Sequence, residues 1–308
     1  MSDIFNISQH DTLFASRTGP EEWARISAFR DRPHYLEGVR LHAGVMQPFF
    51  AYNLILNKVV AEIWRFQMLV FTLYLHETWR EDDPRSGLNL GNLQRVCSNL
   101  NLASPGRVYA FLNIMKIGGY LEKAPTGADN RVSRLAPTRM FMNTVEEWNR
   151  GIWAAIDATN PGGGLVALGQ AYPSLGTGMR NSGAEGLLAG WDPLGPFPEV
   201  SRFAASDGGW MMMEHIVSEA LGSNGRLRRV TINCDLRRTA KQFGGSRSNL
   251  IRLLGEAHDL GLLEIDPRLG REVRFTTKMT CAFLTFLASF LGYFELHTQM
   301  ALERIRTR

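Results

Sequence analysis

Cysteine is scarce in this chain of 308 residues, which contains only three. Cys97, Cys234 and Cys281 lie far apart, and none belongs to a CxxC or CxxH pair. The spacing therefore indicates neither a zinc site nor a disulfide framework. Unpaired cysteines are typical of a reducing compartment, so we expect a cytoplasmic protein.

Long hydrophobic runs are also missing. The uncharged apolar segment 279–294 is shorter than the roughly 20 residues that a membrane-spanning helix requires. The N-terminal segment MSDIFNISQH has neither the basic region nor the apolar core of a signal peptide. We therefore expect no membrane anchor and no signal peptide.

The motifs of common enzyme sites are absent as well. His76 and Glu77 form an HE pair, but no second histidine follows at the position that a zinc protease needs. Gly176, Gly178 and Gly183 do not form the GxGxxG loop of dinucleotide-binding proteins. The sequence therefore predicts no catalytic residue, no cofactor and no metal, and we do not expect an enzyme.

Charge is unevenly distributed along the chain, although its net value is only +4. Residues 88–139 contain seven Lys or Arg against two Asp or Glu, and residues 226–278 contain twelve against six. The two windows carry +5 and +6, so the rest of the chain is acidic. Two basic segments predict contact with a polyanion at two places. The alternative interpretation is a pair of solvated faces.

Apolar residues recur at helical spacing in four long segments. The widest apolar stripe covers residues 52–79 and predicts a helix that is buried on more than one side. The other three segments are 139–157, 210–221 and 279–304. Before them, residues 20–50 predict a short helix or two, beginning near Glu21.

The first half also contains shorter elements in the order helix, helix, hairpin. Apolar spacing predicts one helix over 87–100 and a second over 104–117, with Ser104 as its N-cap. Two strands are expected at 120–122 and 131–135. The hairpin therefore follows the second helix directly.

A segment rich in glycine and proline, residues 160–198, separates the two halves. Because these residues interrupt helices and strands, the segment predicts a connection between domains. Its scattered apolar residues argue against a wholly flexible tether. We accordingly divide the chain into an N-terminal helical extension (1–50), a first module (51–158), a connector (159–198) and a second module (199–308).

The second half repeats the first at a shift of 142 residues. The identical pairs are Ser104 and Ser246, Leu112 and Leu254, Gly119 and Gly261, Leu121 and Leu263, and Glu122 and Glu264. Upstream, a one-residue difference in a turn aligns Leu93 with Leu236. Downstream, a hairpin two residues shorter aligns Arg131 with Arg271 and Arg134 with Arg274. Differences confined to turns are expected of two copies of one fold.

The second copy, residues 236–277, resembles the winged helix-turn-helix of MarR-type transcription regulators. In this resemblance Leu236, Ala240 and Phe243 form the buried side of the first helix, a glycine pair forms the turn, and Ser246 caps the recognition helix. The resemblance implies sequence-specific binding of double-stranded DNA and regulation of transcription. It also implies a cytoplasmic protein that associates with the nucleoid through DNA.

The expected DNA contacts of the second copy follow from its recognition helix. Arg247, Ser248, Asn249 and Arg252 would lie on its outer face, where side chains reach base edges in the major groove. Arg237, Arg238 and Lys241 on the preceding helix would contact phosphates. In the hairpin, or wing, the candidates are Arg268, Arg271 and Arg274. The alternative is a solvated helix face.

The first copy is a weaker match, because its turn lacks the glycine pair. Its expected DNA contacts are Ser104, Arg107, Tyr109 and Asn113 on the recognition helix and Arg131 and Arg134 on the wing. Fewer long polar side chains mean fewer contacts with bases. We expect this copy to read fewer base pairs or to depend more on DNA shape.

Long apolar helices flank both copies, and such helices pair two subunits in the MarR family. Here the two copies on one chain would pair with each other, so the predicted fold is mostly α with small β-hairpin wings, built as a pseudo-dimer. We expect a monomer that binds DNA, although a homodimer is possible in principle. Two modules that did not pack on each other would leave the apolar faces of four helices exposed to water.

Two other functions fit tandem winged helices: a plasmid-type replication initiator and a protein-interaction scaffold. The basic windows argue against the scaffold, and the long flanking helices favour the MarR-like interpretation over the initiator. A small-molecule effector is a further expectation, because Met211, Met212 and Met213 beside Trp210 could line an apolar pocket. Such a cluster is more often part of the core.

Overall fold

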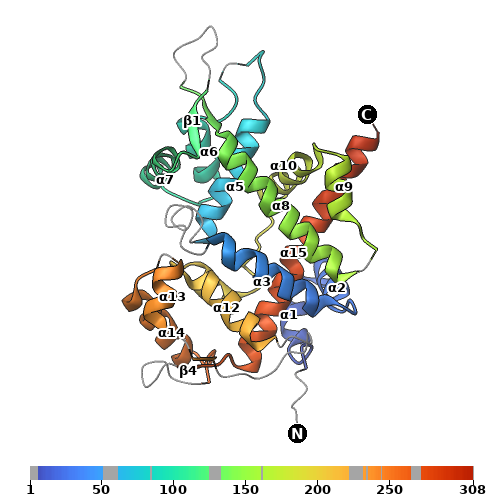
Figure 1. Cartoon of the computed structure of the whole chain (residues 1–308), viewed down its shortest axis with the longest axis vertical. Coiled ribbons are helices and arrows are strands. Elements are labelled where there is room, and N and C mark those ends of the chain that lie inside the picture. Colours follow the sequence, from blue (N-terminus) through green and yellow to red (C-terminus); the bar gives the residue numbers. More distant parts are fainter. Residues whose placement is uncertain are drawn as a thin grey trace.

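The computed structural model describes residues 6–50, 62–83, 85–124, 133–160, 162–221, 232–233, 235–243, 245–264 and 272–307. In these ranges the protein is mostly helical and has two small antiparallel sheets of two strands each (Figure 1). The predicted class, mostly α with small hairpins, is confirmed at this level.

Two units of the chain are built from similar elements, although a strand precedes the two packed helices only in the second unit. The first unit comprises α5 (Ile63–Glu77), α6 (Leu90–Asn99), α7 (Pro105–Ile117), β1 (Leu121–Lys123), β2 (Leu135–Pro137) and α8 (Arg139–Thr159). The second comprises α12 (Gly209–Ala220), β3 (Ile232–Asn233), α13 (Leu236–Phe243), α14 (Arg247–Asp259), β4 (Glu272–Val273) and α15 (Thr277–Arg306). In each, two packed helices precede a hairpin and a long helix.

The turn after α7 and the turn after α14 have the same geometry. Gly119 and Gly261 both have positive φ, 72° and 68°, which ends the helix in the left-handed conformation. The next amide then bonds back into the helix, from Tyr120 to the Met115 carbonyl and from Leu262 to the Ala257 carbonyl, at 2.8 Å in both cases. The shift of 142 residues therefore holds in the backbone.

The hairpin alignment expected from the arginines is wrong. Leu121 pairs with Pro137, and its counterpart Leu263 pairs with Phe275, so the second hairpin is four residues shorter rather than two. Arg134 consequently corresponds to Glu272 and not to Arg274. Strand pairing fixes this register through backbone hydrogen bonds, whereas an exposed arginine can occur at any outward position.

From the hairpin onward a shift of 138 residues applies to the whole of α8. Thr138 and Thr276 both cap the long helix, because their side chains accept hydrogen bonds from the amides of Phe141 and Met279. The buried positions of the two helices then coincide. The pairs are Phe141 and Met279, Val145 and Phe283, Trp148 and Phe286, Ile152 and Phe290, and Ile156 and Phe294.

A segment ahead of the two packed helices also contacts the hairpin in each unit, and the sequence did not predict this contact. In the second unit, β3 pairs antiparallel with β4, Ile232 opposite Val273. In the first unit, a single backbone bond of 2.8 Å from Leu135 to the Leu88 carbonyl occupies the corresponding place. Pairings this short leave no periodic signal in the sequence.

The predicted continuous helix over 52–79 is also wrong. The described helix, α5, begins at Ile63, and Glu62 before it is extended, with φ −128° and ψ 146°. At the other end Glu77 is the last helical residue. The apolar stripe therefore does not belong to one uninterrupted helix.

The glycine-rich connector is largely helical. It contains α9 (Leu165–Ala171) and α10 (Leu175–Leu188), followed by α11 (Pro198–Ala204). Helix α10 packs on α15 and on α5. A Cβ atom at Gly178 would come within 2.8 Å of the Ala301 Cβ, so this glycine permits close helix packing. The prediction that glycine interrupts helices here is wrong, because close packing of the backbones offsets the helix penalty of glycine.

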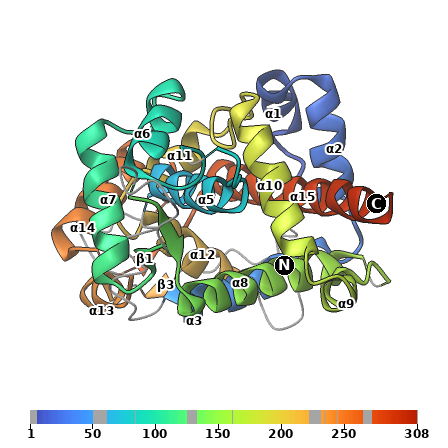
Figure 2. The same ribbon diagram turned by 90° about the horizontal axis from the view of Figure 1, so that it is seen from above.

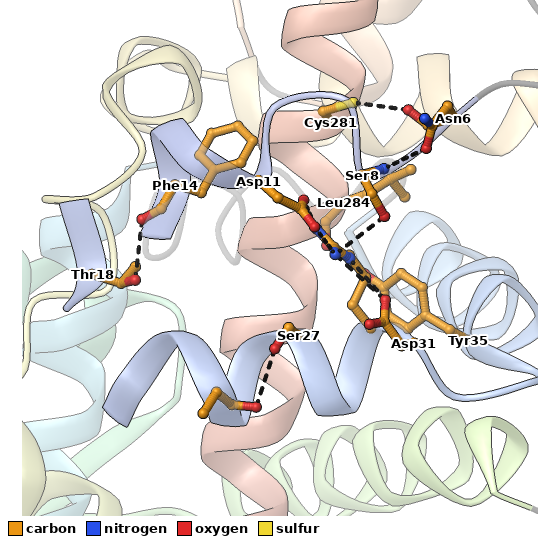
Figure 3. Close-up of polar contacts among 12 residues, drawn as sticks. Asn6, Ser8, Asp11, Phe14, Thr18, Ser27, Asp31, Tyr35, Cys281 and Leu284 are labelled. Atoms are coloured by element: carbon orange, nitrogen blue, oxygen red, sulfur yellow. Dashed lines mark hydrogen bonds and ion pairs between the residues drawn. The ribbon is translucent and has the colours of Figure 1, made fainter. Parts of the chain in front are cut away.

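The N-terminal extension contains three helices, α1 (Asp11–Thr18), α2 (Pro20–Arg30) and α3 (Tyr35–Phe50). Helix α2 packs on α15, and α3 packs on both α8 and α12, so the extension contacts both units. Figure 3 shows the attachment to α15: Tyr35 donates a hydrogen bond to the Leu284 carbonyl, and the Cys281 thiol lies 3.7 Å from the Asn6 carbonyl oxygen. Arg30, buried beside them, pairs with both carboxylate oxygens of Asp11 at 2.6 and 2.8 Å.

The two units share one hydrophobic core. Trp148 of α8 and Phe294 of α15 meet edge to face with ring centroids 5.1 Å apart, and the Trp153 indole donates to the Thr298 hydroxyl at 3.0 Å. Helix α15 is long and apolar enough to cross a membrane, but 72% of its most apolar window is buried in the protein. This is typical of the central helix of a soluble fold.

Candidate nucleic-acid interface

Helices α6, α7, α13 and α14 lie on one side of the molecule. Figures 1 and 2 both place them there, with α2, α9 and α10 on the opposite side. The two helix pairs are separated along the longest axis in Figure 1. The helices that carry predicted DNA contacts in the two copies therefore lie on the same side of the protein.

The start of α14 presents a polar outer face. Ser246 caps the helix by accepting a hydrogen bond from the Asn249 amide at 3.0 Å. The next two residues, Arg247 and Ser248, are exposed, and their side chains make no ion pair or hydrogen bond with other described residues. On the opposite face Leu250, Leu253, Leu254 and Ala257 are buried, as predicted.

Two other expected base contacts are engaged within the protein. The Asn249 side chain donates to the Asp207 carbonyl at 3.3 Å and accepts from Arg252 at 2.9 Å. Arg252 also pairs with Glu256 at 2.7 Å, and Arg202 pairs with the other oxygen of Glu256 at 2.7 Å. DNA would have to replace these contacts, so Arg247 and Ser248 are better placed to meet a base.

Helix α13 supplies exposed positive charge beside α14. Arg237, Arg238 and Lys241 are all exposed, and their side chains form no ion pair with other described residues. The Asp235 carboxylate accepts hydrogen bonds from the backbone amides of Arg237 and Arg238, each at 3.1 Å. It thus caps the helix without pairing with their guanidinium groups.

The wing of the second unit is described only at its base. Arg274 is half-buried there and pairs with Glu264 across the hairpin at 2.6 Å. This ion pair holds Arg274 at the base of the hairpin, although the sequence suggested it as a DNA contact. Arg268 and Arg271, like Arg131 in the first unit, lie outside the described residues.

The first unit presents fewer polar groups. Ser104 precedes α7 with extended backbone, but its hydroxyl caps no amide. Arg107 is exposed and lies over the Trp64 ring at 5.5 Å, while Tyr109 is exposed and Asn113 is half-buried. Arg134 lies over the Trp79 ring at 3.9 Å, which holds this arginine at the base of the hairpin.

One basic residue of the interface was missing from the prediction. Arg95 on α6 is exposed and aligns with Arg238 at the shift of 143 that pairs Leu93 with Leu236. Burial supports that alignment, since Leu93 and Leu236 are both buried, as are Cys97 and Ala240. The same alignment would have identified Arg95 from the sequence alone.

The methionine cluster is part of the hydrophobic core. Met211, Met212 and Met213 are buried at 6%, 0% and 0% exposure and belong to the common core. An apolar cavity of about 80 Å³ lies instead between α5, α8, α10 and α15. Its wall includes aromatic rings from four segments: Phe66, Trp148, Trp191, Tyr293 and Phe294.

The described residues offer little for catalysis or metal binding. No group of three or more His, Cys, Asp or Glu in the described ranges could hold a metal ion. Glu77 of the HE pair forms a buried ion pair with Arg180. Burial raises the pKa of the Cys97 and Cys281 thiols to about 11, which keeps both protonated.

Comparisons with known proteins identify no relative: the chain matches no family model, no curated protein and no solved structure.

Proposed function

We propose that this protein binds double-stranded DNA in a sequence-specific manner and regulates transcription, with the two units acting as winged helix-turn-helix modules of the MarR-like kind. The observation that supports this most is the repetition of helix, helix and hairpin on one side of the molecule. In both copies the two helices carry exposed basic side chains. DNA is the polyanion that such a pair of basic helices fits.

The common core supports a single-chain pseudo-dimer. Two recognition helices held by one rigid core would enter one face of a duplex about one helical turn apart. Because the two helices differ, the site would consist of two unlike half-sites about 10 base pairs apart, centre to centre. The protein would then act as a monomer in the cytoplasm, associated with the nucleoid.

Selection of bound duplexes from random DNA tests this proposal. We expect an enriched site of two unlike halves, and a 1:1 complex by mass measurement with a footprint over both. A 2:1 complex on a short palindrome, or a footprint of one module only, would refute the pseudo-dimer. Failure to enrich any site would refute sequence-specific binding.

Arg247→Ala is the most direct test of the recognition helix. It should weaken binding to the selected site by roughly 1 to 3 kcal/mol and relax the preference at one position. Arg306→Ala, an exposed arginine at the end of α15 on the other side, is the matched control and should leave affinity unchanged. If the sequence preference is unchanged in Arg247→Ala, α14 does not recognise bases in the way proposed.

Two alternative functions give different results in the same experiments. A replication initiator would enrich repeated copies of one half-site instead of two unlike halves. A protein-interaction scaffold would show no salt-dependent affinity for any duplex. The three exposed cations on α13 favour DNA over the scaffold, since a DNA-binding face is much more positively charged than a protein-binding one.

The cavity between α5, α8, α10 and α15 favours an apolar effector as a second element of the function. Arg180 lines this cavity, and its Nε atom has no hydrogen-bond partner among the described residues. Titration with benzoate should quench tryptophan fluorescence, because Trp148 and Trp191 are in the wall. Val145→Phe, which fills the cavity, should abolish the quenching. Unaltered quenching in this variant would place the effector elsewhere.

A further inference from the structure

The outward face of α7 is largely apolar, unlike that of α14. Tyr109 is 56% exposed, and Pro105, Gly106 and Ala110 are exposed beside it. At the shift of 142, the residues of α14 at the same four positions are Ile251, Arg247, Ser248 and Arg252. At three of these positions α14 has side chains that donate hydrogen bonds, where α7 has a pyrrolidine ring, bare backbone and a methyl group. At the fourth, the phenol ring of Tyr109 stands in place of an aliphatic side chain.

The border of this apolar face is cationic and free of acids. Helices α6 and α7 contain no Asp or Glu, and Arg95, Arg107 and Lys116 on them are all exposed. Helix α7 itself lies on the same side of the molecule as α14 (Figures 1 and 2). An apolar centre with a positive border is complementary to the major groove, whose walls are phosphates.

Resting on the proposed function, we propose that α7 reads an A·T-rich half-site through the 5-methyl groups of thymine, with Ala110 and Tyr109 packing against them. The thymine methyl is the apolar group that a base edge displays in the major groove, and it is bound by short apolar side chains and rings. Gly106 has no side chain and Ala110 has a short one, so this helix can approach base edges closely. Unit one thus selects bases by shape and apolar contact, and unit two by hydrogen bonds.

Replacing thymine by deoxyuridine tests this directly, because only the methyl group is removed. The half-site of α14 is identified first, as the half in which Arg247→Ala relaxes the preference. In the other half, each contacted thymine changed to deoxyuridine should lower affinity about fourfold. The same change in the α14 half-site is the matched control and should have no effect.

Two variants connect the effect to α7. In Tyr109→Ala and Ala110→Gly, affinity should fall and the remaining effect of deoxyuridine should shrink, as expected of groups in contact. Both residues are exposed, so Tyr109→Ala should leave the thermal midpoint unchanged. Ala110→Gly should lower it slightly, because glycine costs about 1 kcal/mol in a helix interior, and circular dichroism at the assay temperature will show that this variant is folded.

Four results would overturn the inference while leaving the proposed function standing. The first three are a deoxyuridine effect equal in both halves, no effect in either half, and an effect that neither variant alters. The fourth is a second copy of the chain bound to this face, seen as a doubled mass that Tyr109→Glu abolishes. If no duplex is enriched at all, the proposed function itself fails, and this failure is recognised before any thymine is replaced.

Discussion

Helices α7 and α14 bury side chains at the same positions but expose different ones. Val108, Phe111, Leu112 and Met115 are buried in α7, and their counterparts Leu250, Leu253, Leu254 and Ala257 are buried in α14. On the outside, Pro105 stands where α14 has Arg247, and Ala110 where it has Arg252. A close-packed interior constrains side-chain volume, whereas an exposed face tolerates change. The two units therefore preserve a common fold while their exposed side chains have diverged.

The largest expected effect concerns the shared inner face. Leu112→Ala and Leu254→Ala remove aligned leucines that are 2% and 0% exposed. Each should lower the free energy of unfolding by about 2 to 5 kcal/mol, since both leave a cavity in a packed interior. Urea unfolding followed by tryptophan fluorescence and by circular dichroism measures this loss.

Because the units share a core, each leucine variant should still unfold in one transition seen equally by both probes. Tyr109→Ala on the exposed face is the control and should change stability by no more than about 0.5 kcal/mol. A second transition in either leucine variant would show that the two units are energetically independent.

The next effect distinguishes the two long helices by pH. At the shift of 138, Thr159 of α8 corresponds to His297 of α15, so only the second unit has a titrating group at this buried position. His297 Nδ1 lies 2.8 Å from the Ser182 hydroxyl. Burial lowers the pKa of His297 to about 4, from an unfolded value of 6.5.

Between pH 6.5 and about 4 the unfolded chain therefore binds a proton at residue 297 that the folded protein excludes. Stability should fall as pH decreases through this window, by as much as about 3 kcal/mol. His297→Gln retains a polar side chain that does not titrate, and it should flatten this part of the curve. If the variant and the parent lose stability in parallel from pH 6.5 to 4, His297 is not the source.

Much of the fold was predictable because the residues that reveal the repeat are mostly buried. The shift of 142 came from identities such as Leu112 with Leu254 and Gly119 with Gly261, which packing and backbone conformation restrict. The same reasoning failed for the hairpin, where Arg134 was aligned with Arg274. Those arginines are outside the packed interior, so their agreement carried no information on register.

Glycine was the other source of error. In residues 165–188 it was interpreted as a breaker, although Gly178 and its neighbours lie in a helix that packs closely on α15. A single sequence does not distinguish a glycine that ends a helix from one that permits contact with another. At the candidate interface, the exposure of Arg247 and Arg107 could be predicted from residue type and position, whereas the engagement of Asn249 and Arg252 depends on contacts that only the fold creates.

A smaller effect compares the helices that precede the recognition helices. Arg95 on α6 and Arg238 on α13 are aligned and exposed, and both are expected to contact phosphates. Alanine at either position should weaken binding to specific and to nonspecific DNA about equally, and it should lower the salt slope of binding by about one. Titrations at several salt concentrations measure both slopes. If the salt slope of binding is unchanged in Arg95→Ala but lower in Arg238→Ala, then of these two helices only α13 contacts phosphates.

The smallest effect separates the two serine N-caps. Ser246 and Ser104 hold the same position before their helices, but only the Ser246 hydroxyl accepts an amide hydrogen bond, from Asn249. Ser246→Ala should therefore cost about 1 kcal/mol, within the range of about 0.5 to 2 for loss of a cap, while Ser104→Ala should cost little. Thr276→Ala, which removes a cap of the same kind at the start of α15, is the positive control. Equal losses for both serines would mean that the Ser104 hydroxyl caps α7 in solution, and the two recognition helices would then begin alike.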